Sequence, residues 1–143
     1  MLATLASAAV ARAEPGTKPF RFFGGFNAAA YCDGSGIIPS PMTLPAPYAG
    51  FAIIRAPSSL ELEATVSIRG YALTYYTVRL IQGADDCQTV DWEGLTNGAG
   101  MATIHLSEPV VSSTAFIAID QYSTFEGVPF EINWSFVTET YRH

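Results

Sequence analysis

Basic residues are scarce in this chain, and their scarcity excludes two classes of partner. The 143 residues include only seven Lys and Arg against thirteen Asp and Glu, a formal net charge of −6. Proteins that bind nucleic acid neutralise phosphates with clustered basic side chains, and an anionic membrane surface attracts polybasic segments. The sequence therefore predicts neither nucleic acid nor an anionic lipid surface as a partner.

Histidine and cysteine are also scarce, which limits the catalytic chemistry that is open to the chain. There are two histidines, His105 and the terminal His143, and two cysteines, Cys32 and Cys87. No G-x-S-x-G nucleophile motif is present, and neither cysteine has a histidine close to it in the sequence. The residues therefore favour a non-catalytic protein over a serine or cysteine hydrolase.

The two cysteines fit an oxidising compartment, where disulfides form and persist. We predict a disulfide between Cys32 and Cys87. It would close a loop of about 55 residues and stabilise the fold by roughly 4 kcal/mol in the chain-entropy model. Two buried free thiols are the alternative, whereas a metal site would need further Cys or His residues nearby.

The first residues have the pattern of an export signal. Residues 2–11 form an apolar run too short to span a bilayer, and Ala11-Arg12-Ala13 places small residues at the −3 and −1 positions of a signal-peptidase site. No basic residue precedes the run, so an ordinary helix is the alternative. We expect cleavage after Ala13, which leaves residues 14–143 as one soluble domain, secreted or periplasmic, without a membrane span.

The pattern of β-strands is abundant. Val, Ile, Thr, Tyr and Phe are plentiful and only 14% of the residues are charged. From Leu60 to Ile68 apolar and polar residues alternate without an error, as in a strand with one buried face. After Gly70 a second run, rich in Tyr, Thr and Val, extends to Ile81. We predict that these two runs pair with each other as central strands of a sheet.

Other segments have the composition of strands: 20–26, 51–55, 89–92, 101–106, 114–120 and 130–138. Residues 114–120 are apolar on both faces, which is typical of a central strand, and residues 121–128 are expected to form a loop. The last run is expected to face the core with Phe130, Ile132, Trp134 and Phe136. The pattern predicts an all-β fold, an antiparallel two-sheet sandwich of about seven to nine strands.

The segment LTNGAGMATIHLSEPVVSSTAFIAID, residues 95–120, resembles the turn–Gly–strand–Pro–strand pattern common in secreted immunoglobulin-like and prealbumin-like sandwich modules. The resemblance implies a sandwich fold. It carries no catalytic or binding residue over to this chain.

Carboxylates suggest two sites, each with a simpler alternative. Ca²⁺ takes oxygen ligands, so the acidic stretch around Cys87 could hold a structural calcium ion, or it could be a solvated loop. Glu61 and Glu63 share the outward face of one strand. They could act together in glycoside hydrolysis only inside a cleft, and otherwise they form a wet strand face. The candidate calcium ligands are Asp85, Asp86, Asp91 and Glu93.

Two aromatic residues, Tyr75 and Trp92, are expected to be exposed. Tyr75 shares a strand face with Thr77 and Arg79, and Trp92 lies in the acidic stretch. Exposed aromatic side chains bind sugar rings or protein partners. Tyr75 and Trp92 are therefore the candidate ligand-binding residues.

Three functions remain open. The first is an exported non-catalytic sandwich that acts by binding a protein or glycan, or by assembly, including self-association. The second is a carbohydrate-binding or carbohydrate-active module that uses Trp92 and Tyr75. The third is a small secreted hydrolase inhibitor, in which the proline-rich stretch 39–47 is the inserting loop. No cofactor is expected apart from the calcium considered above.

Overall fold

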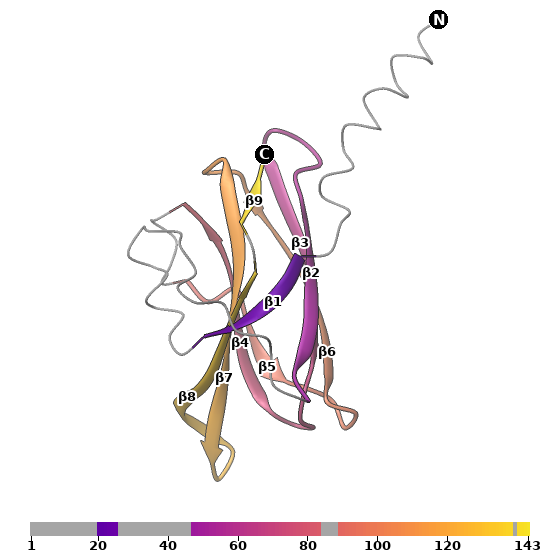
Figure 1. Ribbon diagram of the computed structural model, residues 1–143. Helices are drawn as coiled ribbons and strands as arrows, with labels where there is room; N and C mark the ends of the chain where they lie inside the picture. The colour runs from indigo at the N-terminus through magenta and orange to yellow at the C-terminus, as the bar shows by residue number, and fades with distance from the viewer. Residues whose placement is uncertain (1–19, 26–46, 84–88, 139) are drawn as a thin grey trace, which may run out of the picture.

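The computed structural model describes residues 20–25, 47–83, 89–138 and 140–143, and this part of the chain is built from strands without a helix (Figure 1). The described residues form nine strands: β1 (Phe20–Gly25), β2 (Ala49–Arg55), β3 (Glu61–Arg69), β4 (Tyr75–Gln82), β5 (Trp92–Leu95), β6 (Met101–Pro109), β7 (Thr114–Phe125), β8 (Val128–Thr138) and β9 (Tyr141–Arg142).

The strands form two antiparallel sheets. The three-stranded sheet has the order β2-β3-β6, and the six-stranded sheet has the order β5-β4-β7-β8-β1, with β9 paired to β7. β1 touches both sheets, because Phe20 and Arg21 pair with β2 whereas the residues from Phe22 to Gly25 pair with β8. The prediction of an all-β antiparallel two-sheet sandwich is therefore confirmed.

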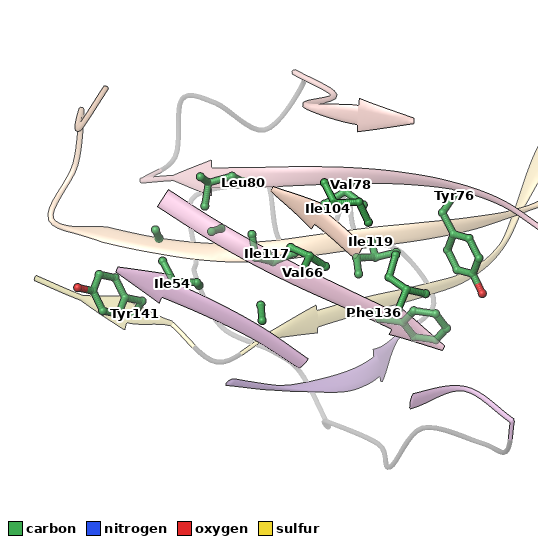
Figure 2. Packing of buried hydrophobic residues seen from close by; sticks show 14 of the residues in the cluster. Ile54, Val66, Tyr76, Val78, Leu80, Ile104, Ile117, Ile119, Phe136 and Tyr141 are labelled. Atoms are coloured by element: carbon green, nitrogen blue, oxygen red, sulfur yellow. The ribbon is translucent and has the colours of Figure 1, made fainter. Parts of the chain in front are cut away.

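Buried apolar side chains from both sheets form the core (Figure 2). β3 buries every second residue from Leu62 to Ile68, as its alternation predicts. Each fully buried aliphatic side chain of this kind contributes roughly 1.5–3 kcal/mol. Leu60, which was expected to face inward, precedes β3 and is 77% exposed. Among the core side chains that are fully buried, the largest are Ile54, Leu62, Val66, Tyr76, Val78, Leu80, Ile117 and Ile119.

β7 is the central strand of the six-stranded sheet, as its composition predicts. It lies between β4 and β8, and its residues from Ala115 to Gln121 are all buried. A strand buried on both faces needs apolar residues at nearly every position, and AFIAI meets this need. Asp120 and Gln121 are the polar exceptions, and both are hydrogen-bonded.

The predicted pairing of the two central runs is wrong. β3 pairs with β2 and β6, whereas β4 pairs with β5 and β7, so the chain crosses between the sheets at residues 70–74. Leu73 in this crossing has a φ of 52°, a left-handed conformation. Alternation shows that a strand has one buried face, but it does not identify the strand's neighbours.

A second crossing, from β5 to β6 at residues 96–100, lies beside the first, and together they form what we call the crossover junction. The amide of Gly70 donates to the carbonyl of Gly100 at 2.8 Å, and the amide of Leu73 donates to the carbonyl of Asn97 at 3.2 Å. These hydrogen bonds hold the two crossings together and set the register between β3 and β6.

Thr96 completes the crossover junction from inside. It is 1% exposed, and its hydroxyl donates to the carbonyl of Tyr71 at 2.7 Å and accepts from the amide of Thr74 at 3.0 Å. Its own amide donates to the carbonyl of Thr74 at 3.0 Å. The side chain therefore satisfies backbone groups that the turn of the chain leaves unpaired.

Gly100 is required at the junction for two reasons. Its φ is +77°, and a Cβ at this position would lie 2.0 Å from the carbonyl oxygen of Gly70. No side chain fits there without moving the backbone of the neighbouring crossing. Gly98 lies in the same turn without either restriction, since a Cβ there meets nothing within 4 Å.

We predict that Gly100→Ala lowers the free energy of unfolding by at least about 2 kcal/mol, because it combines a left-handed conformation with a backbone clash. Gly98→Ala is the matched control and should change it by less than about 0.5 kcal/mol. Urea unfolding followed by intrinsic fluorescence measures both. Equal losses in the two variants would contradict this account of the junction.

Candidate functional site

Four side chains form a row across the outward face of the six-stranded sheet. Tyr75 on β4 is paired with Leu95 on β5 and with Tyr122 on β7, and Tyr122 is in turn paired with Ile132 on β8. Directly paired residues of antiparallel strands project from the same face and lie close together. We call this set, Leu95, Tyr75, Tyr122 and Ile132, the aromatic row. Leu95 and Ile132 at its ends are exposed.

Tyr75 is held in place within the row by two neighbours. Its ring meets that of Tyr122 edge to face, with 5.5 Å between the centroids and an interplanar angle of 79°. Its hydroxyl donates to Oε2 of Glu93 at 2.6 Å. This hydrogen bond favours the neutral phenol and is the main reason that the pKa of Tyr75 is raised to about 12.

The hairpin of β7 and β8 carries exposed apolar side chains next to the row. A two-residue turn at Glu126 and Gly127 joins the strands, and both residues have positive φ, as a hairpin turn of type I′ requires. Beside it, Phe125 is 70% exposed, Val128 62% and Phe130 61%. We call these three residues the apolar hairpin. Phe125 stands three residues beyond Tyr122 on β7 and is paired with Val128, so these two side chains project from the side of the sheet opposite the row. The row and the hairpin together are a surface that wraps around the projecting end of β7 and β8, and we call it the binding face.

Two sequence-based expectations fail at this hairpin. Residues 121–128 are not a loop, because β7 continues to Phe125. Phe130 and Ile132 do not face the core, because the β7–β8 pairing shifts register between Gln121 and Tyr122 and again between Ser123 and Thr124. Each shift inserts a residue into β8 and breaks its alternation, so a period extrapolated from Phe136 assigns the wrong face.

Next to the aromatic row, further along the same face of the sheet, lies a cluster of buried polar side chains. Asp120 is 1% exposed and accepts hydrogen bonds from Arg79 and from Ser135, each at 2.6 Å. Thr77 is also buried, and within the described part of the chain neither its hydroxyl nor Nε of Arg79 has a hydrogen-bond partner. Removing one partner of a buried ion pair typically costs about 3–5 kcal/mol, so this cluster constrains the sheet beneath the row.

The outward face of the three-stranded sheet carries a second group of polar residues around a depression of about 180 Å³. Arg55 pairs with Glu63 at 2.8 Å, and the Thr65 hydroxyl lies 3.2 Å from Nδ1 of His105. Glu61 accepts a hydrogen bond from the hydroxyl of Ser107. The two carboxylates expected to share a face therefore do share it, and each interacts with a residue of a neighbouring strand.

Trp92 differs from its expected position. It is half-buried and packs against the core, because it is paired with Val78, an inward-facing residue of β4. Gly94, two residues further along β5, leaves room for the indole ring, since a Cβ there would lie 2.8 Å from it. Trp92 and Tyr75 therefore lie on opposite faces of the six-stranded sheet and do not form one site.

The other predicted sites are only partly within the described residues. Asp91 accepts a hydrogen bond from the amide of Leu80 at 2.7 Å, and Glu93 accepts one from Tyr75. Across the described ranges, no three His, Cys, Asp or Glu side chains are grouped so that they could hold a metal ion. Four predicted residues lie outside those ranges: Asp85 and Asp86 of the calcium set, and Cys32 and Cys87 of the disulfide.

Sequence reasoning missed Leu95, Tyr122 and Ile132 as members of the site. The signal for Tyr122 was available, since Glu126-Gly127 between two extended runs is a hairpin pattern that would have extended β7 beyond Asp120. The pairing of Tyr75 with Leu95 and Tyr122 depends on strand order, which no local pattern encodes.

The chain matches no protein-family model, no curated protein and no solved structure. Where the structure describes the chain, no helix is long and apolar enough to cross a membrane.

We predict that the carboxylate of Glu93 sustains the raised pKa of Tyr75. The phenol of Tyr75 should ionise near pH 12 in the folded protein, and Glu93→Gln should move this ionisation toward 10, because it removes the negative charge beside the phenol. Since the folded pKa lies above the unfolded one, the associated stability is present below pH 10 and is lost as the pH rises through 12.

The measurement is the ultraviolet difference spectrum of tyrosinate during an alkaline titration. Subtracting the titration of Tyr75→Phe isolates Tyr75 from the other tyrosines. An unchanged Tyr75 titration in Glu93→Gln would show that the hydrogen bond is not its cause.

Proposed function

We propose that this protein is an exported, non-catalytic binding module that engages a protein partner through the binding face. The observation that carries the proposal is the gathering of exposed large apolar side chains on one hairpin and the adjoining row. Soluble proteins rarely leave such side chains together in water, and patches of this kind mark interaction surfaces.

The free energy available at this surface is substantial. An aromatic side chain buries about 150–250 Å², so the two exposed phenylalanines of the hairpin leave roughly 100–150 Å² each in water. At about 25 cal/mol per Å², covering each ring contributes roughly 3 kcal/mol before the costs of association. The two exposed phenylalanines of the hairpin, together with Tyr75 and Tyr122 of the row, have the composition of a binding hot spot.

The geometry favours a protein over a glycan. Stacking on a sugar ring needs an open, flat aromatic face, whereas Tyr75 and Tyr122 are nearly perpendicular. The row ends in the aliphatic side chains of Leu95 and Ile132, which offer a sugar little. Trp92, the other residue expected to bind a glycan, packs against the core.

The strand order supports the comparison with immunoglobulin-like modules. β2, β3 and β6 face β5, β4, β7 and β8, and the chain crosses between the sheets from β3 to β4, from β5 to β6 and from β6 to β7. This arrangement is of the Greek-key kind found in those sandwiches. Many of them act by binding at cell surfaces, which agrees with the proposed role. The inhibitor alternative depends on residues 39–47, which include only one described residue, Pro47.

The binding proposal is tested by comparing three forms of the protein: the unaltered chain, a double serine variant of the hairpin and a control serine variant. The full exported chain is used as bait against the envelope and medium of its own organism, and any captured protein is purified and titrated against three baits. We expect the double variant Phe125→Ser, Phe130→Ser to weaken binding at least about a hundredfold, because both anchors are lost.

Val111→Ser is the control, since Val111 is 71% exposed but precedes the opposite end of β7. It should bind like the unaltered protein. Equal affinity of all three baits, or recovery of a glycan in place of a protein, would overturn the proposal.

The export part of the proposal predicts the mass of the mature protein. The form recovered from outside the cytoplasm should begin at Glu14 and contain the disulfide between Cys32 and Cys87. Intact mass spectrometry, with alkylation before and after reduction, measures both features. A mass that retains residues 1–13, or two thiols alkylated without reduction, would show that the prediction is wrong.

A further inference from the structure

β6 is a border strand of the sandwich. It stands at one end of the strand order and, among the described strands, pairs with β3 alone (Figure 1). It has nine residues, MATIHLSEP, with no Lys or Arg and no irregularity in its pairing. Border strands are normally blunted by lysine, bulges or an internal proline, and a long regular one without them is a template for pairing with another strand.

The backbone groups that β6 presents at its open edge follow from the register. Gly70 donates to Gly100 at one end of the ladder, and Val110 donates to Leu60 at the other. Both are hydrogen-bonded pairs, and such pairs alternate along an antiparallel ladder. Between them, the even-numbered residues from Ala102 to Glu108 therefore bond to β3, and the odd-numbered residues point their amides and carbonyls away from it.

The two outermost odd-numbered residues, Met101 and Pro109, have no backbone groups left for a further strand. The amide and carbonyl of Met101 are hydrogen-bonded to Asn97, at 3.0 and 2.9 Å. Pro109 has no amide hydrogen, and its carbonyl accepts from Gln82 at 2.9 Å. Within the described part of the chain, the open edge thus consists of three residues, Thr103, His105 and Ser107.

The three open residues are arranged symmetrically about His105, and the side chains on either side of His105 are of matching kinds. Thr103 and Ser107 lie two residues to either side and are both small hydroxyl residues, and Ile104 and Leu106 adjoin His105 and are both aliphatic. We propose that two copies of this chain pair antiparallel through β6, with His105 opposite His105 of the second copy. Thr103 then lies opposite Ser107, and every open amide and carbonyl of the three residues meets a partner across the two-fold axis.

The directions of the β6 side chains also agree with pairing to a second copy of the chain. Thr103, His105 and Ser107 face solvent, so none of the three paired residues brings a charge into the interface. Glu108, the charged residue on the inner side, lies at the end of the pairing, opposite Ala102 of the second copy, and accepts a hydrogen bond from Gln82. On the inner side, Ala102 and Leu106 pack against the core but are only half-buried, because β6 is the border of the sheet. A second β6 places Ile104 beside Leu106 of the other copy and shields this side of both cores. Any extended strand offers backbone groups at the same spacing, but a second copy also sets hydroxyl opposite hydroxyl and aliphatic opposite aliphatic side chains across the two-fold axis.

Cysteine substitution tests the register directly in the full chain. Directly opposed residues of a hydrogen-bonded pair have Cα atoms about 5.5 Å apart, within the range of a disulfide. We expect His105→Cys to form a covalent dimer on mild oxidation. Thr103→Cys alone should not, since its two copies would lie about 13 Å apart, four residues along the strand. Mixing Thr103→Cys with Ser107→Cys should restore the cross-link.

The unsubstituted protein under the same oxidation controls for Cys32 and Cys87. Cross-linking of Thr103→Cys alone as readily as His105→Cys, or no cross-link in any variant, would overturn the proposal.

Sedimentation equilibrium tests the association without a cross-link. The unaltered protein should dimerise at micromolar concentration. His105→Pro removes a central donor at the open edge and should weaken the dimer at least about tenfold, and proline is tolerated on a border strand whose amide faces outward. His105→Lys tests the same position without changing the backbone, because it sets two like charges opposite each other.

Ser59→Lys, at an exposed position outside the strands, is the control for added charge and should dimerise normally. A monomeric unaltered protein, or a dimer that His105→Lys leaves intact, would show that β6 is not the interface. The double serine variant of the apolar hairpin should dimerise normally, which separates this inference from the proposed binding function.

Discussion

The hydrogen bond between Gly70 and Gly100 is the constraint on which the rest of the structure depends. It joins two of the places where the chain passes from one sheet to the other, and it forms because Gly100 has no side chain to keep the backbones apart. The buried hydroxyl of Thr96 also bonds to the backbone of the first crossing, so the two crossings are fixed in position relative to each other. That relation fixes how β3 pairs with β6 at one side and how β4 pairs with β5 at the other.

Both surfaces discussed above follow from those two registers. Since β4 and β5 enter the six-stranded sheet from the junction, Tyr75 is brought opposite Leu95, and the pairing with β7 then adds Tyr122. A slip of one residue would turn Tyr75 into the core and expose Tyr76. In the three-stranded sheet, the same junction decides which residues of β6 bond to β3 and leaves Thr103, His105 and Ser107 at the open edge.

Local sequence patterns predicted the strands well and their neighbours poorly. The alternation of β3 and the doubly apolar run of β7 reflect burial, which is a property of each strand alone, and both were confirmed. The pairing of β3 with β4 was wrong because sequence proximity favours a hairpin unless the link turns out of the sheet. Phe130 and Ile132 were assigned to the core because two register shifts in β8 leave no trace in composition. Trp92 was expected in solvent from its acidic neighbours, although a strand turns alternate residues to opposite faces whatever their charge.

The two surfaces share no residue and lie on different sheets. Pairing through β6 joins three-stranded sheets edge to edge and leaves the outward face of each six-stranded sheet uncovered by that contact. A dimer built in this way carries two binding faces, and a partner that presents two sites within reach would be held by both. The second contact is then intramolecular, and avidity can exceed the single affinity by about 10²–10⁴ without any new interaction. A module with a single apolar patch gains from this arrangement, because the partner stays bound through one contact while the other is open.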